Sequence, residues 1–157
     1  MNDRVIISLD QAITTGWCVT IDGDIVSRNH FTVKGNDYDI KINKIKEVVI
    51  KLTEKYKPHL ITVEGVQYQS NQAIYGKLSR LQGVLINYFI ENNILYEIVT
   101  PSQWKGYHKI KGRKRAEQKA NAMLRIKELG IDCDSEDECE AILMNIYAQE
   151  CIDIKFK

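Results

Sequence analysis

The sequence predicts an α/β domain in which helices flank a mixed five-stranded sheet, with three antiparallel strands followed by two parallel ones. Two features predict this class. Short apolar runs rich in β-branched residues occupy the first 33 residues, as is typical of strands. Beyond them, apolar residues spaced three and four apart alternate with further short apolar runs, which is typical of helices that cover a sheet. A chain of 157 residues can bury one core of its own, so we expect residues 1–157 to form a single domain.

Three strands are expected first. Residues 5–9 form a continuous apolar run, which is typical of a central strand buried on both faces. Residues 16–21 and 25–33 form the next two strands, and the sequence Asp-Gly-Asp at 22–24 predicts a tight hairpin turn between them. These three segments are therefore expected to form an antiparallel unit.

The middle of the chain predicts helix, strand, helix and strand. Five apolar residues fall on one face of a helix that Pro58 ends, namely Ile45, Val48, Val49, Leu52 and Tyr56. A short apolar run at 60–63 predicts a fourth strand, and a polar loop at 65–71 leads to a helix around residues 74–89. The run at 94–99 is expected to be the fifth strand, parallel to the fourth because a helix connects them.

The last third of the chain is expected to be helical. Pro101 favours a short helical turn at its first position. A basic loop and a helix through Leu129 follow, and Gly130 ends that helix. The last helix begins in an acidic cluster and is expected to bury five residues, namely Ile142, Leu143, Ile146, Tyr147 and Cys151.

Charge is distributed unevenly along the chain, although the formal net charge is only +1. Residues 105–119 contain one acid and seven basic residues, namely Lys105, Lys109, Lys111, Arg113, Lys114, Arg115 and Lys119. Six of the nine residues from 132 to 140 are acidic. A basic surface beside an acidic cluster is typical of a protein that holds a polyanion close to divalent metal ions.

The composition also argues against several classes of protein. Four cysteines show no C-x-x-C pair and no histidine at zinc-finger spacing, which favours small core residues in a reducing compartment over a zinc site. No apolar run is long enough to span a bilayer. We therefore expect a cytoplasmic protein with no membrane partner and no small-molecule cofactor.

Four acidic residues form the candidate site. Asp10 and Glu64 each stand at the C-terminal end of an expected inner strand, where ligands gather in open sheets. Asp137 and Glu140 are three residues apart, which places them on one face of the last helix. Converging carboxylates repel one another, and hard divalent cations with oxygen ligands relieve that repulsion. The combination indicates a metal site, whereas the cluster at 132–140 taken alone is also compatible with a solvated helix end.

Five segments resemble the RuvC-like Holliday junction resolvases of the RNase H-like superfamily, and most closely the compact versions of bacteriophages. They are ISLDQAITTGW, ITVEGVQYQSN, RLQGVL, TPSQWK and DECEAILMNIY. The resemblance implies a magnesium-dependent endonuclease that acts as a homodimer and cuts two opposed strands of a four-way DNA junction. Asp10, Glu64, Asp137 and Glu140 match the family's acids, which implies that they are catalytic and bind two Mg²⁺ ions, with Mn²⁺ as a substitute.

The resemblance also implies contacts with DNA and with a second copy of the chain. Lys105 matches the family's first phosphate-binding lysine, while Lys111, Lys114 and Lys119 are alternatives for the second. We expect the DNA-binding surface to comprise Lys105, Lys109, Lys111, Arg113, Lys114, Arg115, Lys119 and Tyr68. The helix around residues 74–89 is the expected dimer interface, because Tyr75, Tyr88 and Phe89 widen its apolar stripe.

Departures from the family pattern leave alternatives open. The dipeptide after the first acid is Gln-Ala where the family has Pro-Gly. Gln67 stands where cellular members carry an aromatic residue that helps to open the junction, although Tyr68 is adjacent. Glu140 replaces the usual aspartate, so Glu136 is an alternative to Asp137 as the third ligand.

Other functions are compatible with parts of the sequence. A related nuclease would act on RNA–DNA hybrids or simple branched DNA with the same chemistry. A non-catalytic junction-binding protein would hold metal for stability alone, although a complete set of four acids argues against it. The segment LDQAITTGW also resembles the first phosphate loop of actin-like ATPases and sugar kinases, but those proteins need two lobes and further glycine-rich loops.

Overall fold

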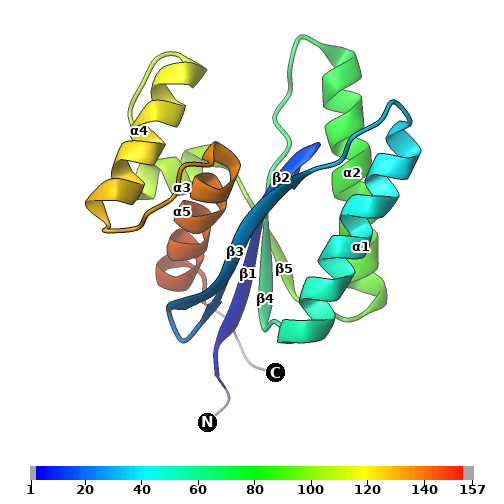
Figure 1. The fold of residues 1–157 in the computed structure, drawn as a ribbon, viewed down its shortest axis with the longest axis horizontal. Coiled ribbons are helices and arrows are strands. Elements are labelled where there is room, and N and C mark those ends of the chain that lie inside the picture. The colour runs from blue at the N-terminus through cyan, green and yellow to red at the C-terminus, as the bar shows by residue number, and fades with distance from the viewer. Residues whose placement is uncertain (1–2, 154–157) are drawn as a thin grey trace.

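A mixed five-stranded sheet forms the centre of the fold in the computed structural model, which describes residues 3–153. The strand order is β3-β2-β1-β4-β5 (Figure 1). The strands β1 (Val5–Asp10), β2 (Thr14–Ile21) and β3 (Asp24–Thr32) pair in antiparallel fashion. The strands β4 (Leu60–Glu64) and β5 (Tyr96–Val99) add to β1 in parallel. The predicted sheet is confirmed, with β1 at its centre.

Within residues 3–153, five helices cover the two faces of this sheet (Figure 1). Helices α1 (Tyr38–Tyr56) and α2 (Gln72–Glu91) lie on one face. On the other face, α5 (Glu136–Cys151) packs against β1 and β2, with α3 (Pro101–Tyr107) and α4 (Arg115–Glu128) outside it. No helix among residues 3–153 combines the length and the apolar character needed to cross a membrane.

Local signals explain where most of these elements begin and end. Asp22 and Gly23 both adopt positive φ between β2 and β3, which is the geometry of a tight hairpin turn. Thr100 and Gln103 form a reciprocal capping box around Pro101 at the start of α3. The expected strand at 94–99 begins only at Tyr96, because the backbone N–H of Ile94 instead donates to the Phe89 carbonyl at the end of α2, at 2.9 Å.

Two predictions were wrong in part: that α5 buries Cys151, and that all four cysteines are core residues. Cys151 is exposed because it is the last residue of α5, beyond the part of the helix that packs on the sheet. Cys18 and Cys139 are buried core residues as expected, while Cys133 is half-buried. All four cysteines are free thiols.

The alternation of side chains along β1 decides which residues meet α5. Ile7 and Leu9 belong to the core beneath α1 and α2, whereas Ile6 packs against Ala148 of α5. Because successive side chains of a strand point to opposite faces, Asp10 shares the α5 face with Ile6. The first candidate carboxylate therefore points toward the helix that carries two of the others.

The same face receives the candidate carboxylate of β4. Ser8 and Thr62 are paired in the β1–β4 ladder, and the Thr62 hydroxyl donates to the Ser8 hydroxyl at 2.6 Å. Glu64 is two residues beyond Thr62, so its side chain also lies on the α5 side. The parallel pairing of β1 and β4 thus brings two strand-end acids to one edge of the sheet.

Asn145 fixes α5 on the sheet. Its side chain is fully buried, and its amide donates to the carbonyls of Ile6 and Cys18, both at 3.2 Å. Its side-chain oxygen accepts from the hydroxyl of Thr20 and from the amide of Gln149, both at 2.8 Å. A buried amide with every donor and acceptor used defines one docking position, because displacement would leave several polar groups unpaired.

Candidate active site

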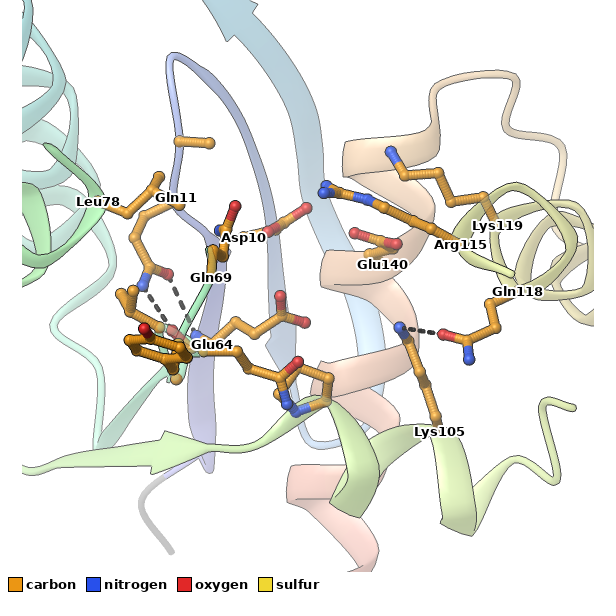
Figure 2. A pocket seen from close by; sticks show the side chains of 16 residues that line it. Asp10, Gln11, Glu64, Gln69, Leu78, Lys105, Arg115, Gln118, Lys119 and Glu140 are labelled. Atoms are coloured by element: carbon orange, nitrogen blue, oxygen red, sulfur yellow. Dashed lines mark hydrogen bonds between the residues drawn. The ribbon is translucent and has the colours of Figure 1, made fainter. Parts of the chain in front are cut away.

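The structure brings the four predicted acids together: Asp10, Glu64 and Glu140 line one cavity, and Asp137 lies beside Asp10 and Glu140. Oxygens of Asp10, Asp137 and Glu140 lie within 4.8 Å of one another. Glu64 lines the same cavity, of about 450 Å³, together with Asp10 and Glu140 (Figure 2). Three separate elements, β1, β4 and α5, therefore supply the carboxylates.

Gly16 allows α5 to approach the sheet closely enough for this arrangement. It pairs with Asp10 across the β1–β2 ladder. A Cβ at this position would lie 2.2 Å from the carbonyl oxygen of Asp137 and 2.7 Å from the backbone nitrogen of Glu138. Any side chain here would push the start of α5 away from Asp10. Sequence reasoning missed this role of Gly16, although its position shortly after Asp10 was visible.

The carboxylates at the start of α5 have different partners. Glu138 is buried and accepts from Arg28 of β3 at 2.9 Å, with His30 at 3.1 Å from its second oxygen. Glu136 is bound instead to Lys119 of α4, at 2.9 Å. Asp137 remains free to face Asp10 and Glu140. This geometry favours Asp137 over Glu136 as the third ligand.

Crowding and burial raise the proton affinity of two of the acids. Burial, and then the charges of Glu140 and Glu64, raise the pKa of Asp10 well above its ordinary value. Burial and the charge of Glu140 raise the pKa of Glu64 to about 7, although the N–H of Trp104 and the charges of Lys105 and Arg115 act in the opposite direction. A cavity that disfavours its own ionised carboxylates is suited to divalent cations.

Glu64 is held by groups that the sequence did not point to. The side-chain amide of Gln11 donates to the Glu64 carbonyl at 2.6 Å and accepts from the Glu64 N–H at 3.1 Å (Figure 2). Gln82 of α2 donates to the same carbonyl at 2.8 Å. The indole N–H of Trp104 donates to the Glu64 carboxylate at 2.8 Å. Gln11, noted only as a departure from a family pattern, extends the β1–β4 ladder by one side chain.

The basic segment contributes three of its seven residues to the cavity. Lys105, Arg115 and Lys119 line it, and they project from α3 and α4 opposite the carboxylates (Figure 2). Lys105 donates to the side chain of Gln118 at 3.0 Å. The other basic residues, Lys109, Lys111, Arg113 and Lys114, lie between α3 and α4 and do not line the cavity.

The loop that carries these four basic residues is held by side chains of α4. Asn121 donates to the carbonyl of Lys111 at 2.6 Å, and Gln118 donates to the carbonyl of Gly112 at 3.0 Å. The backbone N–H of Arg113 donates to Glu117 at 3.1 Å. The loop therefore presents its charges from a defined backbone.

Tyr68 lies where the cavity opens to solvent. It lines the cavity and is 78 % exposed. Its ring contacts the ring of Tyr75 edge-on, with 5.8 Å between centroids. An exposed aromatic pair beside a charged cavity offers faces on which nucleic-acid bases can stack.

Comparison with known proteins identifies the family. A family model described as crossover junction endodeoxyribonuclease RuvC matches residues 13–147. The chain belongs to the RuvC family. Its fold is accordingly the RNase H-like fold that the sequence predicted, and family membership supports a Holliday junction endonuclease. A comparison with curated protein sequences gave no significant match.

Solved structures of RuvC and of other resolvases share this fold. RuvC of T. thermophilus in complex with a Holliday junction substrate is 13 % identical, with a TM-score of 0.72 over 94 % of this chain and 95 % of that chain. The fowlpox virus resolvase with its Holliday junction DNA is 14 % identical, with a TM-score of 0.60 over 95 % and 99 %. The yeast mitochondrial Holliday junction resolvase is 13 % identical, with a TM-score of 0.56 over 93 % and 80 %.

The raised pKa of Glu64 predicts how stability depends on pH in the absence of metal. The folded state raises this pKa to about 7, above the value of an unfolded chain, so the folded state binds the proton more tightly. The resulting stabilisation is present at pH 4 and is lost as the pH rises through 7. For this group alone the free energy of unfolding should fall by about 3 kcal/mol.

Urea denaturation in EDTA between pH 5 and pH 8 measures this effect. Glu64→Gln removes this titrating group and should make the pH dependence shallower, leaving the part that Asp10 contributes. Glu47→Gln, an exposed change on α1, should leave the wild-type dependence intact. If the wild type and Glu64→Gln show equal pH dependence, the folded state does not raise the pKa of Glu64.

Proposed function

We propose that this chain resolves four-way DNA junctions by metal-dependent hydrolysis of phosphodiester bonds. The observation that carries the proposal is the meeting of four carboxylates, three of them lining a cavity whose opposite wall is basic, on a chain of the RuvC family. Basic side chains attract a polyanion. Pairs of metal ions held by carboxylates promote the hydrolysis of phosphodiesters. The arrangement supports a nuclease more directly than a passive DNA-binding protein.

Asp10, Glu64, Asp137 and Glu140 would hold two Mg²⁺ ions, with Mn²⁺ as a substitute. The donor set fits hard cations, because it consists of carboxylate oxygens alone. The raised pKa values of Asp10 and Glu64 support this fit, since a bound cation relieves the repulsion that causes them. When bound, such ions activate a water molecule and stabilise the leaving oxygen.

The remaining side chains orient the DNA backbone. Lys105, Arg115 and Lys119 face the carboxylates across the cavity, so a phosphate between the two walls would meet their charges on one side. Lys119 is the best placed alternative for the second phosphate contact, because Lys111 and Lys114 do not line the cavity. The four basic residues between α3 and α4 extend the positive surface along a longer stretch of DNA. Tyr68 would contact bases at the opening of the cavity.

A homodimer is part of this proposal, with α2 as the interface. The expected contribution of Tyr88 and Phe89 was wrong, because both are buried in the core of the subunit. The outer face of α2 instead carries Gly76 and Gly83, and a Cβ on either would meet no atom within 4 Å. Glycine inside a helix costs about 1 kcal/mol relative to alanine. Two open glycines one heptad apart, with exposed Ile90 beyond them, would allow a second α2 to pack closely.

Cleavage of end-labelled DNA tests this function and the roles of the acids. With Mg²⁺, the wild type should cut a four-way junction at two symmetric positions in opposed strands, as a two-fold dimer would. A linear duplex and an RNA–DNA hybrid of matching sequence should remain largely intact. Asp10→Asn and Glu140→Gln should cut about a hundredfold or more slowly, because each removes a metal ligand, while binding the junction with unchanged affinity in Ca²⁺.

Glu136→Gln is the matched control, since that carboxylate faces Lys119 and not the cavity. It should cut at a rate close to that of the wild type. If the protein cuts the RNA–DNA hybrid in preference to the junction, the hybrid and not the four-way junction is its substrate. Normal cleavage by Asp10→Asn and Glu140→Gln would show that the site is elsewhere.

The salt dependence of junction binding tests the basic wall. Neutralising Lys105, Arg115 and Lys119 to Gln should lower the slope of log K against log salt by about 2 to 3, because each lost phosphate contact contributes about 0.9 on duplex DNA. Neutralising Lys44, Lys51 and Lys55, which are exposed on α1 across the sheet, is the control with equal charge loss. If both triple variants lower the slope equally, binding depends on total charge and the basic wall has no special role.

A further inference from the structure

Trp104 connects the core of the protein to the candidate site. Its side chain is fully buried among residues of α3, α4 and α5. Its indole nitrogen is 2.8 Å from Oε2 of Glu64. The ring packs in this core. The hydrogen bond at its edge is a second role that packing alone does not require.

The backbone of Glu64 is already fixed by other residues. Gln11 forms two hydrogen bonds, one with the N–H and one with the carbonyl of Glu64 (Figure 2). Gln82 adds a third, to the carbonyl. The remaining freedom of Glu64 is therefore rotation of its side chain. The hydrogen bond from Trp104 restrains that rotation, because it commits one of the two carboxylate oxygens.

An indole N–H is suited to this task. It only donates a hydrogen bond and does not ionise at physiological pH, and the buried ring cannot swing away without opening the core. The N–H occupies one lone pair of Oε2 and leaves both lone pairs of Oε1 open to a ligand in the cavity. Groups that hold a metal ligand in this way commonly tune metal affinity by tenfold to a hundredfold, as a rough guide.

We propose that Trp104 is a positioning residue for cleavage, and that its hydrogen bond holds the Glu64 carboxylate in the orientation in which it would bind a divalent metal together with Asp10 and Glu140. The inference rests on the proposed function. It assigns to Trp104 a role in metal binding that does not depend on contact with DNA. The role can therefore be measured on the protein with Mg²⁺ alone.

The chain offers an internal control, because it contains two tryptophans. Trp17 packs in the core beneath α1 and α2, and its indole N–H is 3.4 Å from the hydroxyl of Ser27 on β3. Proton–nitrogen NMR spectra should therefore show two indole signals, assigned with Trp17→Phe and Trp104→Phe. Titration of the wild type with Mg²⁺ should shift the Trp104 signal in a saturable way and leave the Trp17 signal in place.

Trp104→Phe keeps an aromatic six-membered ring and removes the N–H donor together with the pyrrole part of the buried indole. Its affinity for Mg²⁺, measured by calorimetry and by the rise in melting temperature, should fall by about tenfold. Tyr107→Phe is the matched control, as a neighbouring aromatic residue of α3 that is 43 % exposed and should keep wild-type affinity. A lower Mg²⁺ affinity in Trp104→Phe, with unshifted backbone amide signals of Ala122, Ile126 and Leu143 in the core that surrounds Trp104, separates positioning from damage to the fold.

The outcomes distinguish this inference from the function on which it rests. If the wild type binds Mg²⁺ but the Trp104 signal does not move and Trp104→Phe binds equally well, the role of Trp104 is overturned and the proposed function stands. If the wild type binds no Mg²⁺ or Mn²⁺, the proposed function fails as well. The wild-type titration remains decisive if Trp104→Phe does not fold.

Discussion

The close contact between α5 and the sheet at Gly16 is the constraint on which the candidate site depends. With a Cβ at residue 16 only 2.2 Å from the Asp137 carbonyl, no larger residue fits without moving the helix. Asn145 holds the middle of α5 through its buried hydrogen bonds, and Glu138 holds its first turn through Arg28 at 2.9 Å. Helix position, and with it the place of the last two carboxylates, follows from these contacts.

The packing of α5 on the sheet destabilises the folded protein at the candidate site. It brings four carboxylates from three elements together at one partly desolvated cavity, which three of them line. The raised pKa values of Asp10 and Glu64 are the physical sign of the cost. The fold tolerates that cost because α5 is anchored elsewhere, by an apolar core and by fully paired polar groups. A site of this kind holds its ligands in place before the cation arrives, and the folded protein gains stability when the cation binds.

The sequence revealed the elements and the acids because their signals are local. An apolar run that ends in Asp10, another that ends in Glu64, and two acids three residues apart can be recognised without a fold. The supporting contacts join residues far apart in the chain, such as Trp104 to Glu64 across 40 positions, so no local pattern contains them. The prediction that Tyr88 belongs to a dimer interface failed for a related reason. The apolar periodicity of α2 shows that Tyr88 is covered, but not whether the sheet or a second subunit covers it.

Anomalous diffraction from crystals soaked in Mn²⁺, without DNA, tests the central claim most directly. The claim is that α5 docking assembles one metal site from Asp10, Glu64, Asp137 and Glu140. Manganese peaks should then lie inside this cavity, in contact with carboxylates of both the sheet and α5. Manganese bound only at acids outside the cavity, such as Glu136, or a cavity that stays empty at saturating Mn²⁺, would contradict the account.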